Sequence, residues 1–418
     1  MDPAGAGSAA RPLRILVVTE AFPNPSETFI VHQVNGLIAR GHQVTILATP
    51  GLEGLPVHAA VLRHRLVERV LLRPTPKGLQ RLAVLGQAIR RIGWGRTLRS
   101  VAPWHGLHAR NGRLTAAALA LGDTTTYDAV LGHFGPNGEL AAQLRAAGLL
   151  QGAVLAFFHG VDVGTRSPAA LRRRYPRLFS DGDYLLAASE HFRLRLEQAG
   201  VPRERLAVHH MGIELADAQP YRALAPLAFL TIGRLVEKKG IDTALRALAA
   251  LRHAPTLADR PWRYHVVGDG VQRGQLTALA EELGIAERVE FHGWRDQAYI
   301  AALMARCTVL LAPSRTPPSG DTEACPLSIS EGLTAGLVVC ATRHGGIPEM
   351  IRDDETGLLC AEGDDRALAV QIARAVADPA LAARLVTAGQ AHIRAEWDIE
   401  RLNDLLVERI HGALARYA

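Results

Sequence analysis

Two carboxylates eight positions apart are the residues of this sequence with the clearest chemical potential. Glu323 and Glu331 bound the segment Glu-Ala-Cys-Pro-Leu-Ser-Ile-Ser-Glu, and upstream Arg234 and Lys239 lie in the turn Gly-Arg-Leu-Val-Glu-Lys-Lys-Gly. Carboxylates accept hydrogen bonds from vicinal hydroxyls, whereas Arg and Lys neutralise phosphates, and the positive end of a helix adds to that field. The residues after Glu331 predict a helix that begins there. Together these groups suit a ligand with sugar hydroxyls at one end and phosphates at the other, such as a nucleotide sugar.

The cations follow a predicted strand at residues 227–232. Both side chains can therefore point out of the carboxyl end of that strand, where two fixed cations would stabilise a departing diphosphate. Lys238 is adjacent, and residue type alone does not separate it from Lys239. A solvated charged turn, a first-turn acid at Glu331 and a loop charge at Glu323 would each be ordinary features in isolation. Their joint spacing favours a ligand site.

Three further polar positions follow predicted strands in the first half of the chain. His159 comes after residues 153–158, His133 after residues 129–131, and Ser26, Glu27 and Thr28 after residues 14–19. In open α/β sheets, ligands gather at the carboxyl ends of the strands. A histidine after two phenylalanines is also common in a packed core, and Ser26 would equally serve as a helix cap.

Strands and helices alternate through both halves of the chain. The first half has β-branched or apolar runs at residues 14–19, 44–47, 129–131, 153–158 and 184–188, and the second at 227–232, 263–267, 289–291, 309–312, 338–341 and 357–360. Helical patterns include residues 28–39, 243–252 and 276–283, and the chain ends in an amphipathic segment. The pattern predicts an α/β protein with a first domain at 1–215, a second at 216–396, and a final helix at 397–418.

These motifs resemble the retaining glycosyltransferases of family 4. That family carries a Glu-x7-Glu pair after an Arg and a Lys in a Gly-Arg-Leu-x-x-x-Lys-Gly turn. Residues 22–30, 157–162 and 320–323 add a likeness to its members from bacterial exopolysaccharide assembly, of the colanic-acid and amylovoran type. The likeness runs from about Arg14 to Trp397. It implies the GT-B fold, in which two Rossmann-like domains face a cleft and the C-terminal helix packs back on the first domain.

The resemblance also implies roles for individual residues. Arg234 and Lys239 would hold the diphosphate, Glu331 the ribose, and Glu323 the transferred sugar. Further residues of the implied site are Gly233, Pro326 and Leu327 for the donor, His159 near the anomeric carbon, and Ser26, Glu27, Thr28 and His133 for the acceptor. Cys325 departs from the residues usual in the family and leaves the donor's identity open.

The implied reaction is retaining transfer of a hexosyl unit from a nucleotide sugar, most simply a UDP-hexose, to a glycan or lipid-linked saccharide. We expect no cofactor and no metal, since Asp181-Gly-Asp183 matches a metal motif of another architecture but precedes a strand in a turn. No nucleic-acid partner is expected. A transferase acting on a soluble natural product and a GT-B sugar-nucleotide epimerase are the alternatives.

Basic residues are concentrated in one segment of the chain. The net charge is +6, but residues 61–113 hold twelve Lys and Arg against the single acid Glu68: Arg63, Arg65, Arg69, Arg73, Lys77, Arg81, Arg90, Arg91, Arg96, Arg99, Arg110 and Arg113. With Trp94, Trp104 and several leucines between them, they suit an anionic membrane face or a phosphorylated acceptor. An Arg-rich solvated helix is the alternative.

The rest of the composition bears on the compartment. No apolar run approaches the ~20 residues that span a bilayer, and the first residues lack the apolar stretch of a signal peptide. The four cysteines stand singly and predict buried thiols. We therefore expect a cytoplasmic protein that is peripheral on the inner face of the membrane if the basic segment docks there.

Overall fold

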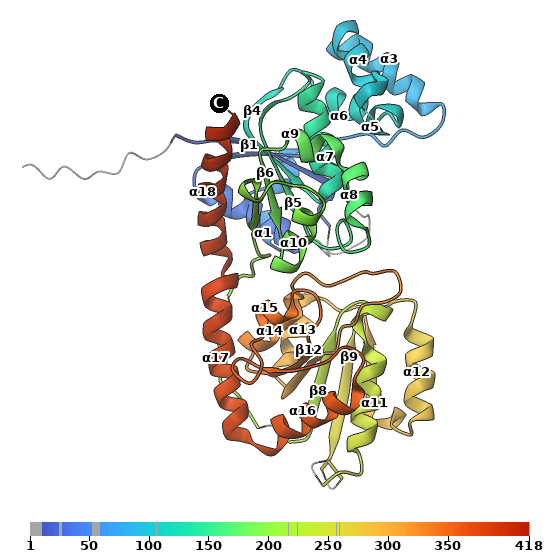
Figure 1. Ribbon diagram of the computed structural model, residues 1–418, viewed down its shortest axis with the longest axis vertical. Helices are drawn as coiled ribbons and strands as arrows, with labels where there is room; N and C mark the ends of the chain where they lie inside the picture. Colours follow the sequence, from blue (N-terminus) through green and yellow to red (C-terminus); the bar gives the residue numbers. More distant parts are fainter. Residues whose placement is uncertain are drawn as a thin grey trace, which may run out of the picture.

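The computed structural model contains two parallel β-sheets, one in each half of the chain (Figure 1). It describes residues 11–24, 27–51, 59–105, 107–215, 217–223, 225–255, 257–258 and 260–417. The two lobes lie one above the other, and the last two long helices run along one side of both (Figure 1). This two-domain α/β arrangement confirms the predicted fold class.

The first sheet has the strand order β3-β2-β1-β4-β5-β6-β7, all parallel. Its strands are β1 (Arg14–Phe22), β2 (Gln43–Pro50), β3 (Val70–Leu72), β4 (Thr126–His133), β5 (Gln151–Phe158), β6 (Tyr184–Ala187) and β7 (Leu206–Val208). Strand β3 was not predicted, because three residues at a sheet edge carry too little pattern to separate them from a loop. The helices of this half are α1 (Thr28–Ala39), α2 (Ala59–Arg63), α3 (Gln80–Ile92), α4 (Trp94–Val101), α5 (Leu107–Arg110), α6 (Arg113–Leu121), α7 (Gly135–Ala146), α8 (Pro168–Arg174), α9 (Pro176–Asp181) and α10 (Glu190–Gln198).

The second sheet has the order β10-β9-β8-β11-β12-β13, again all parallel. Its strands are β8 (Leu227–Ile232), β9 (Trp262–Val267), β10 (Val289–Gly293), β11 (Val309–Ala312), β12 (Val338–Thr342) and β13 (Leu358–Cys360). The helices are α11 (Ile241–Leu251), α12 (Arg273–Glu282), α13 (Gln297–Met304), α14 (Leu327–Thr334), α15 (Ile347–Met350), α16 (Asp365–Ala377), α17 (Pro379–Trp397) and α18 (Ile399–Tyr417).

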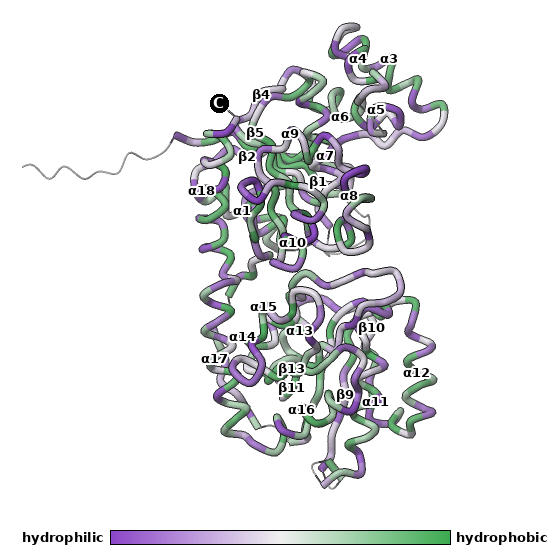
Figure 2. Tube along the Cα trace, in the orientation of Figure 1, coloured by the Kyte–Doolittle hydropathy of each residue, from purple (hydrophilic) through white to green (hydrophobic). Residues whose placement is uncertain are grey.

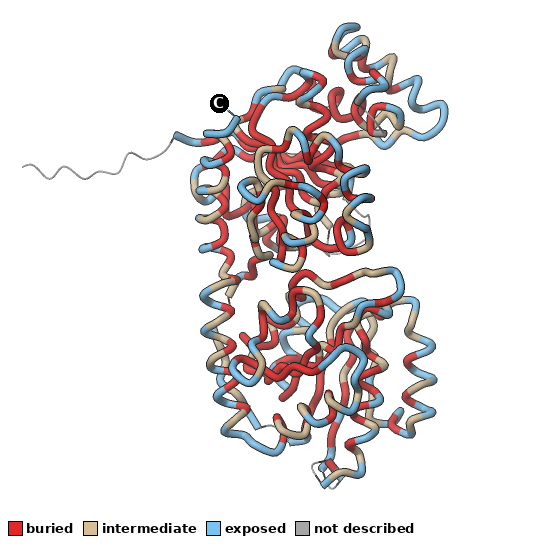
Figure 3. Tube along the Cα trace, viewed as in Figure 1, coloured by how far each residue is buried: buried red, intermediate tan, exposed pale blue. Residues whose placement is uncertain are grey.

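Each sheet is buried on both faces by helices, which explains why its strands are apolar rather than alternating. In the first half, α1, α2 and α18 pack on one face and α6 to α10 on the other. In the second half, α11, α12 and α16 cover one face, and α13 to α15 with the end of α17 cover the other. Apolar and buried residues follow the strands in both lobes (Figures 2 and 3).

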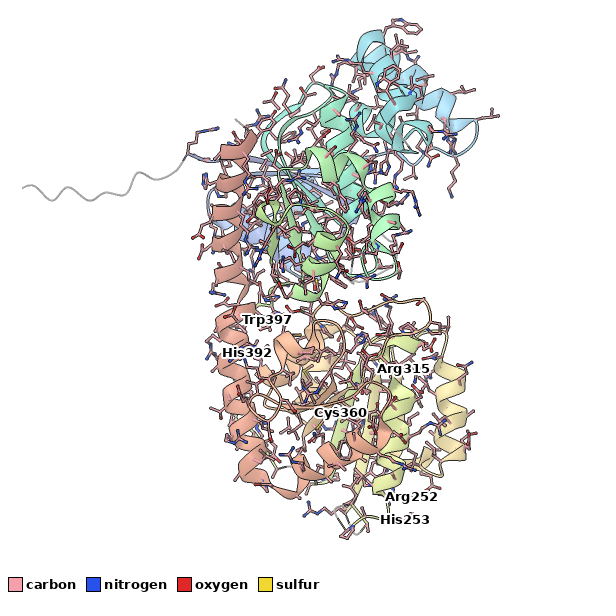
Figure 4. The ribbon with its side chains drawn as sticks, viewed as in Figure 1. Arg252, His253, Arg315, Cys360, His392 and Trp397 are labelled. Carbon is pink, nitrogen blue, oxygen red and sulfur yellow. The ribbon has the colours of Figure 1, made fainter. Side chains whose placement is uncertain are left out.

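The chain passes between the lobes twice at one edge. The first crossing is the segment after β7, and the second is the junction at Asp398, where α17 ends and α18 begins. Helix α18 occupies nearly all of the final helix predicted at residues 397–418. Ile213 and Asp398 form a parallel bridge, and the backbone N–H of Ile399 donates to the carbonyl of Ile213 at 3.1 Å. Trp397 stacks on His210 with ring centroids 4.5 Å apart, at the position labelled in Figure 4. Helix α18 then packs on α1 and β5 of the first lobe.

Candidate functional site

Two lysines and two carboxylates converge where β8 and β11 end. Lys239 Nζ lies 2.9 Å from Glu323 Oε1, and Lys238 Nζ lies 3.0 Å from Asp321 Oδ2 and 3.9 Å from Glu323 Oε1. Both lysines come from the turn after β8, and both acids from the loop after β11. The sequence predicted Lys239 and Glu323 as site residues and did not separate Lys238 from Lys239. Asp321 lies within the segment 320–323, but no role was predicted for it.

The backbone of Glu323 is fixed by the loop after β12. Its N–H donates to His344 Nε2 at 3.0 Å, and its carbonyl accepts from the N–H of Gly346 at 3.1 Å. Gly345 has φ +51°, and a Cβ there would lie 2.2 Å from the Glu323 carbonyl oxygen, so a side chain would displace the loop. His344 in turn pairs with Glu362 at 2.8 Å between Nδ1 and Oε1. His344 was missed, because only the fold brings it to this loop.

The charge state of Glu323 follows from these neighbours. Burial alone would raise the pKa of this carboxyl, but Lys239 and then Lys238 outweigh it, so the pKa lies below its ordinary value. Glu323 is therefore an ionised acceptor of hydrogen bonds in an otherwise dry position. Hydroxyl groups of a bound sugar are suitable donors to it.

Arg234 extends from the same turn as the lysines and is exposed. Gly233 precedes it with φ +151°, and a Cβ on Gly233 would lie 2.8 Å from Cε of Lys239. The glycine therefore allows the lysine side chain to fold back across the turn. Arg234 and Lys239 are thus held on one turn, with Arg234 open to solvent.

Glu331 does not begin a helix, which corrects the sequence-based expectation. Helix α14 begins at Leu327 with Pro326 in the N-cap position, and Glu331 lies in its second turn. The helix therefore starts closer to Glu323 than expected, because the fixed φ of a proline suits a helix start. Pro326 and Leu327, both expected at the donor site, form this start.

Glu331 and Leu327 line a cavity of about 570 Å³ between the two lobes. Thr28 of α1, Gln297 of α13 and the crossing segment from Gly212 also line it. Gln297 Nε2 donates to Glu331 Oε1 at 3.2 Å. Burial raises the pKa of Glu331 to about 7, and the hydrogen bond from Gln297 lowers it only in part. The cavity therefore presents a carboxyl group that changes charge near neutral pH.

His159 lies in an aromatic cluster at the end of β5. Its Nε2 is 3.1 Å from Nδ1 of His133, and its ring centroid is 4.6 Å from that of Phe29. His159 is 9% exposed and His133 is fully enclosed. Burial lowers the pKa of both imidazoles, to about 3 for His133, so both are neutral. His133 is therefore enclosed in the first lobe, in contact with His159, and its proposed role toward the acceptor stays a prediction.

Asp162 fixes the loop that carries His159. Its carboxylate accepts from the N–H groups of His159 at 3.1 Å, Gly160 at 2.8 Å and Gly135 at 2.9 Å. The last of these begins α7, so the loop is tied to a helix start. The motif Phe-Phe-His-Gly-Val-Asp thus places its aspartate as a brace for its histidine.

Charged residues also gather at the end of β1. Glu27 occupies the N-cap position of α1, and Ser26 lies outside the described residues. Burial, and secondarily Glu20, raises the pKa of Glu27 to about 7. Glu20 pairs with Arg113 and, at 3.4 Å, with Arg73. These groups and Thr28 lie at the carboxyl ends of the first sheet, the side expected for an acceptor.

The basic segment divides between internal and external roles. Arg73 is 1% exposed, and several other members form ion pairs, including Arg63 with Glu214 and Arg65 with Glu68. Helices α3 and α4 project from the body of the first lobe (Figure 1). They carry exposed arginines and large exposed apolar side chains: Arg81, Arg90, Arg91, Arg99, Leu82, Trp94 and Leu98.

The two lobes also touch beside the donor-side loop. Glu349 of α15 accepts from the backbone N–H groups of Glu190 at 2.8 Å and His191 at 3.2 Å, at the start of α10. Cys325 is 1% exposed and its Sγ lies 3.5 Å from the carbonyl of Ala188. The residue in which the sequence departs from the family therefore packs between the lobes.

The Asp181 and Asp183 pair is occupied by structural contacts. Asp183 pairs with Arg145 and accepts from the N–H of Val154 at 2.6 Å, while Asp181 ends α9 and pairs with Arg177 at 3.5 Å. The motif thus lies between the end of α9 and β6, and it precedes a strand as the sequence predicted. All four cysteines are buried, again as predicted.

Comparisons with known proteins identify the family. The family model "Glycosyltransferase Family 4" matches residues 26–217, and "Glycosyl transferases group 1" matches residues 217–392. The amylovoran biosynthesis glycosyltransferase AmsK of Erwinia amylovora is 32% identical over 405 residues, which cover 92% of this chain and 96% of AmsK. The chain belongs to the family 4 glycosyltransferases. A protein of Escherichia coli K12 named as colanic acid biosynthesis glycosyltransferase WcaL is also 32% identical, over 84% of this chain and 88% of WcaL.

Solved structures agree with the fold of this glycosyltransferase. Anabaena HepE in complex with UDP superposes with a TM-score of 0.70 and 19% identity, covering 96% of this chain and all of that one. Sucrose-phosphate synthase of Thermosynechococcus elongatus superposes with a TM-score of 0.68 and 20% identity, covering 96% of this chain and 99% of the synthase. Among the described helices of the transferase, none is long and apolar enough to span a membrane.

Proposed function

We propose that this glycosyltransferase moves a hexosyl unit from a nucleotide sugar, most simply a UDP-hexose, to a glycan or lipid-linked saccharide. The reaction retains the anomeric configuration and uses no metal. It serves the assembly of exopolysaccharide or cell-surface glycan. The observation that carries the proposal is the convergence of Lys238, Lys239, Asp321 and Glu323 where β8 and β11 end. Helix α14 begins shortly after Glu323, and its residues Leu327 and Glu331 line the cavity between the lobes. The names of AmsK and WcaL support the pathway, and HepE, solved with UDP-glucose, supports the donor class.

The charges suit a donor with a diphosphate. Arg234, Lys238 and Lys239 carry three positive charges. Asp321 pairs with Lys238 and Glu323 pairs with Lys239, so the site has one positive charge in excess. A diphosphate would draw Lys239 and Arg234, and would release Glu323 for the hydroxyls of the sugar. Because charge on the leaving diphosphate grows as the glycosidic bond breaks, fixed cations stabilise the transition state more than the ground state.

The bond changes then need no protein nucleophile. The bond from the anomeric carbon to the diphosphate oxygen breaks, and the acceptor oxygen bonds to the same face of that carbon. The acceptor's proton passes to the departing diphosphate oxygen. Glu323, which the diphosphate releases from Lys239, is assigned to the hydroxyls of the sugar rather than to attack on its anomeric carbon. Without donor, Lys238 pairs with Asp321 and Lys239 pairs with Glu323, so neither acid is an open ligand for a divalent ion.

The first lobe is the proposed acceptor side. Glu27, with its pKa of about 7, and the neutral His159 lie at the carboxyl ends of its sheet. Helices α3 and α4 supply the exposed arginines and apolar side chains that suit an anionic bilayer. We place the enzyme in the cytoplasm, peripheral on the inner face of the membrane, where a lipid-linked saccharide would be presented.

A panel of nucleotide sugars tests the proposal. The enzyme is incubated with each donor, with and without a pool of lipid-linked saccharides, and products are followed by mass spectrometry and by NMR of the anomeric proton. We expect UDP-hexose to give a product heavier by one hexosyl unit with the donor's anomeric configuration. Inversion would refute the retaining mechanism, and an epimerised donor formed without acceptor would favour the epimerase.

A further inference from the structure

Three potential metal ligands meet at the edge of the second sheet, on residues with no part in the proposed reaction. Glu290 and His292 lie two positions apart on the edge strand β10, so their side chains leave the same face. His265 is the register partner of Glu290 on the neighbouring strand β9. The pairing of the two strands thus fixes the backbones of His265 and Glu290 before any ligand binds, and the paired residues Phe291 and Gly293 flank His292 at a shift in the register.

The distances among the three ligand atoms are those of a coordination sphere. His265 Nδ1 lies 3.0 Å from His292 Nε2 and 3.4 Å from Glu290 Oε2, and His292 Nε2 lies 3.9 Å from the same oxygen. The point in their plane equidistant from all three atoms is about 2.0 Å from each, which matches Zn–N and Zn–O bond lengths of roughly 2.0–2.2 Å. A small ion fits there without movement of the backbone.

Tyr299 favours the ligand form of His292. Its Oη lies 2.9 Å from Nδ1 of His292 and can accept a hydrogen bond from the Nδ1–H, which leaves the Nε2 lone pair directed at the other two ligands. The side chain of Glu290 is 47% exposed, which leaves solvent access for a fourth ligand.

We propose that His265, Glu290 and His292 bind a divalent transition-metal ion of the zinc class, with water as the fourth ligand. Two imidazoles and one carboxylate select zinc, nickel or copper over magnesium and calcium, which prefer oxygen ligands. Three arginines lie nearby and weaken the affinity without occupying the site. Arg295 stacks on Tyr299 at 4.9 Å, and Arg263 bonds to the carbonyl of Glu287 while its Nε lies 3.9 Å from Oε1 of Glu290, the carboxylate oxygen that is not directed at the imidazoles. Arg306 adds positive charge near His265.

The site adjoins the donor cavity through one helix. Tyr299, which contacts His292, lies on α13 with Gln297, the partner of Glu331. An ion that fixes His292 would therefore hold the start of α13. None of the three ligands is assigned to the donor or the acceptor, so the proposed role of the ion is structural and separate from the transfer step.

Direct zinc binding tests the proposal. Untagged full-length protein is freed of metal with a chelator and titrated with zinc chloride in competition with a chromophoric zinc indicator, and thermal unfolding is recorded with and without zinc. The test variants are His265→Ala/His292→Ala and Glu290→Gln. The control is His253→Ala, because His253 is exposed and lies at the far end of the second lobe (Figure 4).

We expect the unmodified protein and the control to bind one zinc ion and to gain thermal stability from it. Each test variant should bind zinc at least about tenfold more weakly, since even the loss of a residue that only supports a metal ligand typically lowers metal affinity by about that factor. X-ray absorption should give Zn–N and Zn–O distances of about 2.0 Å. Equal zinc affinity in the double variant and the unmodified protein, or no binding by the latter, would overturn the proposal. Far-UV circular dichroism checks the fold of each variant, and the milder Glu290→Gln variant keeps the test valid if the double variant unfolds.

Discussion

The strongest test of the donor site uses the acidity of Glu331. This carboxyl lines the cavity between the lobes, and burial raises its pKa from an ordinary 4.5 to about 7. If it accepts hydrogen bonds from both hydroxyls of the donor's ribose, it must be ionised to do so. Because the raised pKa keeps the proton on Glu331 below about pH 7, donor affinity should fall as the pH falls through that value.

The magnitude follows from the fraction of enzyme with Glu331 ionised. With a pKa of about 7, that fraction is roughly one in eleven at pH 6 and ten in eleven at pH 8, so the donor KM should differ by about tenfold between the two. The diphosphate of a nucleotide sugar stays fully ionised across this range. Replacement by glutamine removes the charge, and each hydrogen bond to a charged group contributes about 1.5–3 kcal/mol. Glu331→Gln should therefore raise the donor KM at pH 8 by tenfold or more.

The assay measures initial rates of transfer over a series of donor concentrations between pH 6 and pH 8. The acceptor is kept saturating, so that titration of Glu27 on the acceptor side does not enter the donor KM. Glu331→Gln serves as the matched control, and its donor KM should be flat across the series. If the unmodified enzyme has the same donor KM at pH 6 and at pH 8, the reasoning is refuted. It is also refuted if the donor KM of Glu331→Gln depends on pH as strongly as that of the unmodified enzyme.

Four other predictions concern the reaction, its environment and the fold. Arg234→Ala and Lys239→Ala should each lower kcat by ~10²-fold or more while the protein stays folded, because each removes a cation from the leaving group; full activity in either would refute the diphosphate assignment. Treatment with EDTA should leave transfer largely intact, and loss of activity that magnesium or manganese restores would contradict a metal-independent step. The enzyme should sediment with anionic vesicles at low salt and release at high salt, since four arginines at ~1 kcal/mol each give roughly millimolar binding before any apolar insertion. Neutral vesicles are the control. Replacement of Arg90, Arg91, Arg96 and Arg99 by Glu should abolish sedimentation. An unmodified enzyme that stays in solution with anionic vesicles at low salt would favour a soluble acceptor. Leu406→Ala should lower the free energy of unfolding by about 2–5 kcal/mol in chemical denaturation, because Leu406 is fully buried in the first lobe; a change within error would show that α18 is dispensable there.

Local sequence patterns predicted most of the strands and several of the residues proposed for the donor site. Strands such as β5 and β8 are runs of apolar residues buried on both faces, and such runs are visible without knowledge of their neighbours. Lys239 and Glu323 were found because a short turn and a fixed spacing define them. Glu331 was placed wrongly within its helix, because the residues after Glu331 were taken as the helix start and Pro326, which precedes the actual start, was not.

What the sequence could not supply is contact between distant segments. The hydrogen bond from the N–H of Glu323 to His344 and the pairing of Lys238 with Asp321 depend on how three loops meet. The burial of His133 behind His159 is likewise a property of the packed sheet. The apposition of His265 with Glu290 and His292 depends on strand register, which no local pattern specifies.

The return of α18 to the first lobe has a consequence for how the protein is made. Leu406, Ile410 and Ala413 complete an apolar core whose other members come from the first lobe, chiefly β1, β2, β4, β5, α1 and α2. A ribosome produces those strands early, yet the helix that covers them emerges only after the entire second sheet has been synthesised. The first lobe must therefore wait with an open apolar face through most of translation, and such exposed surface is what chaperones bind and aggregation exploits. The early part of the chain reaches its final form only when the late part arrives.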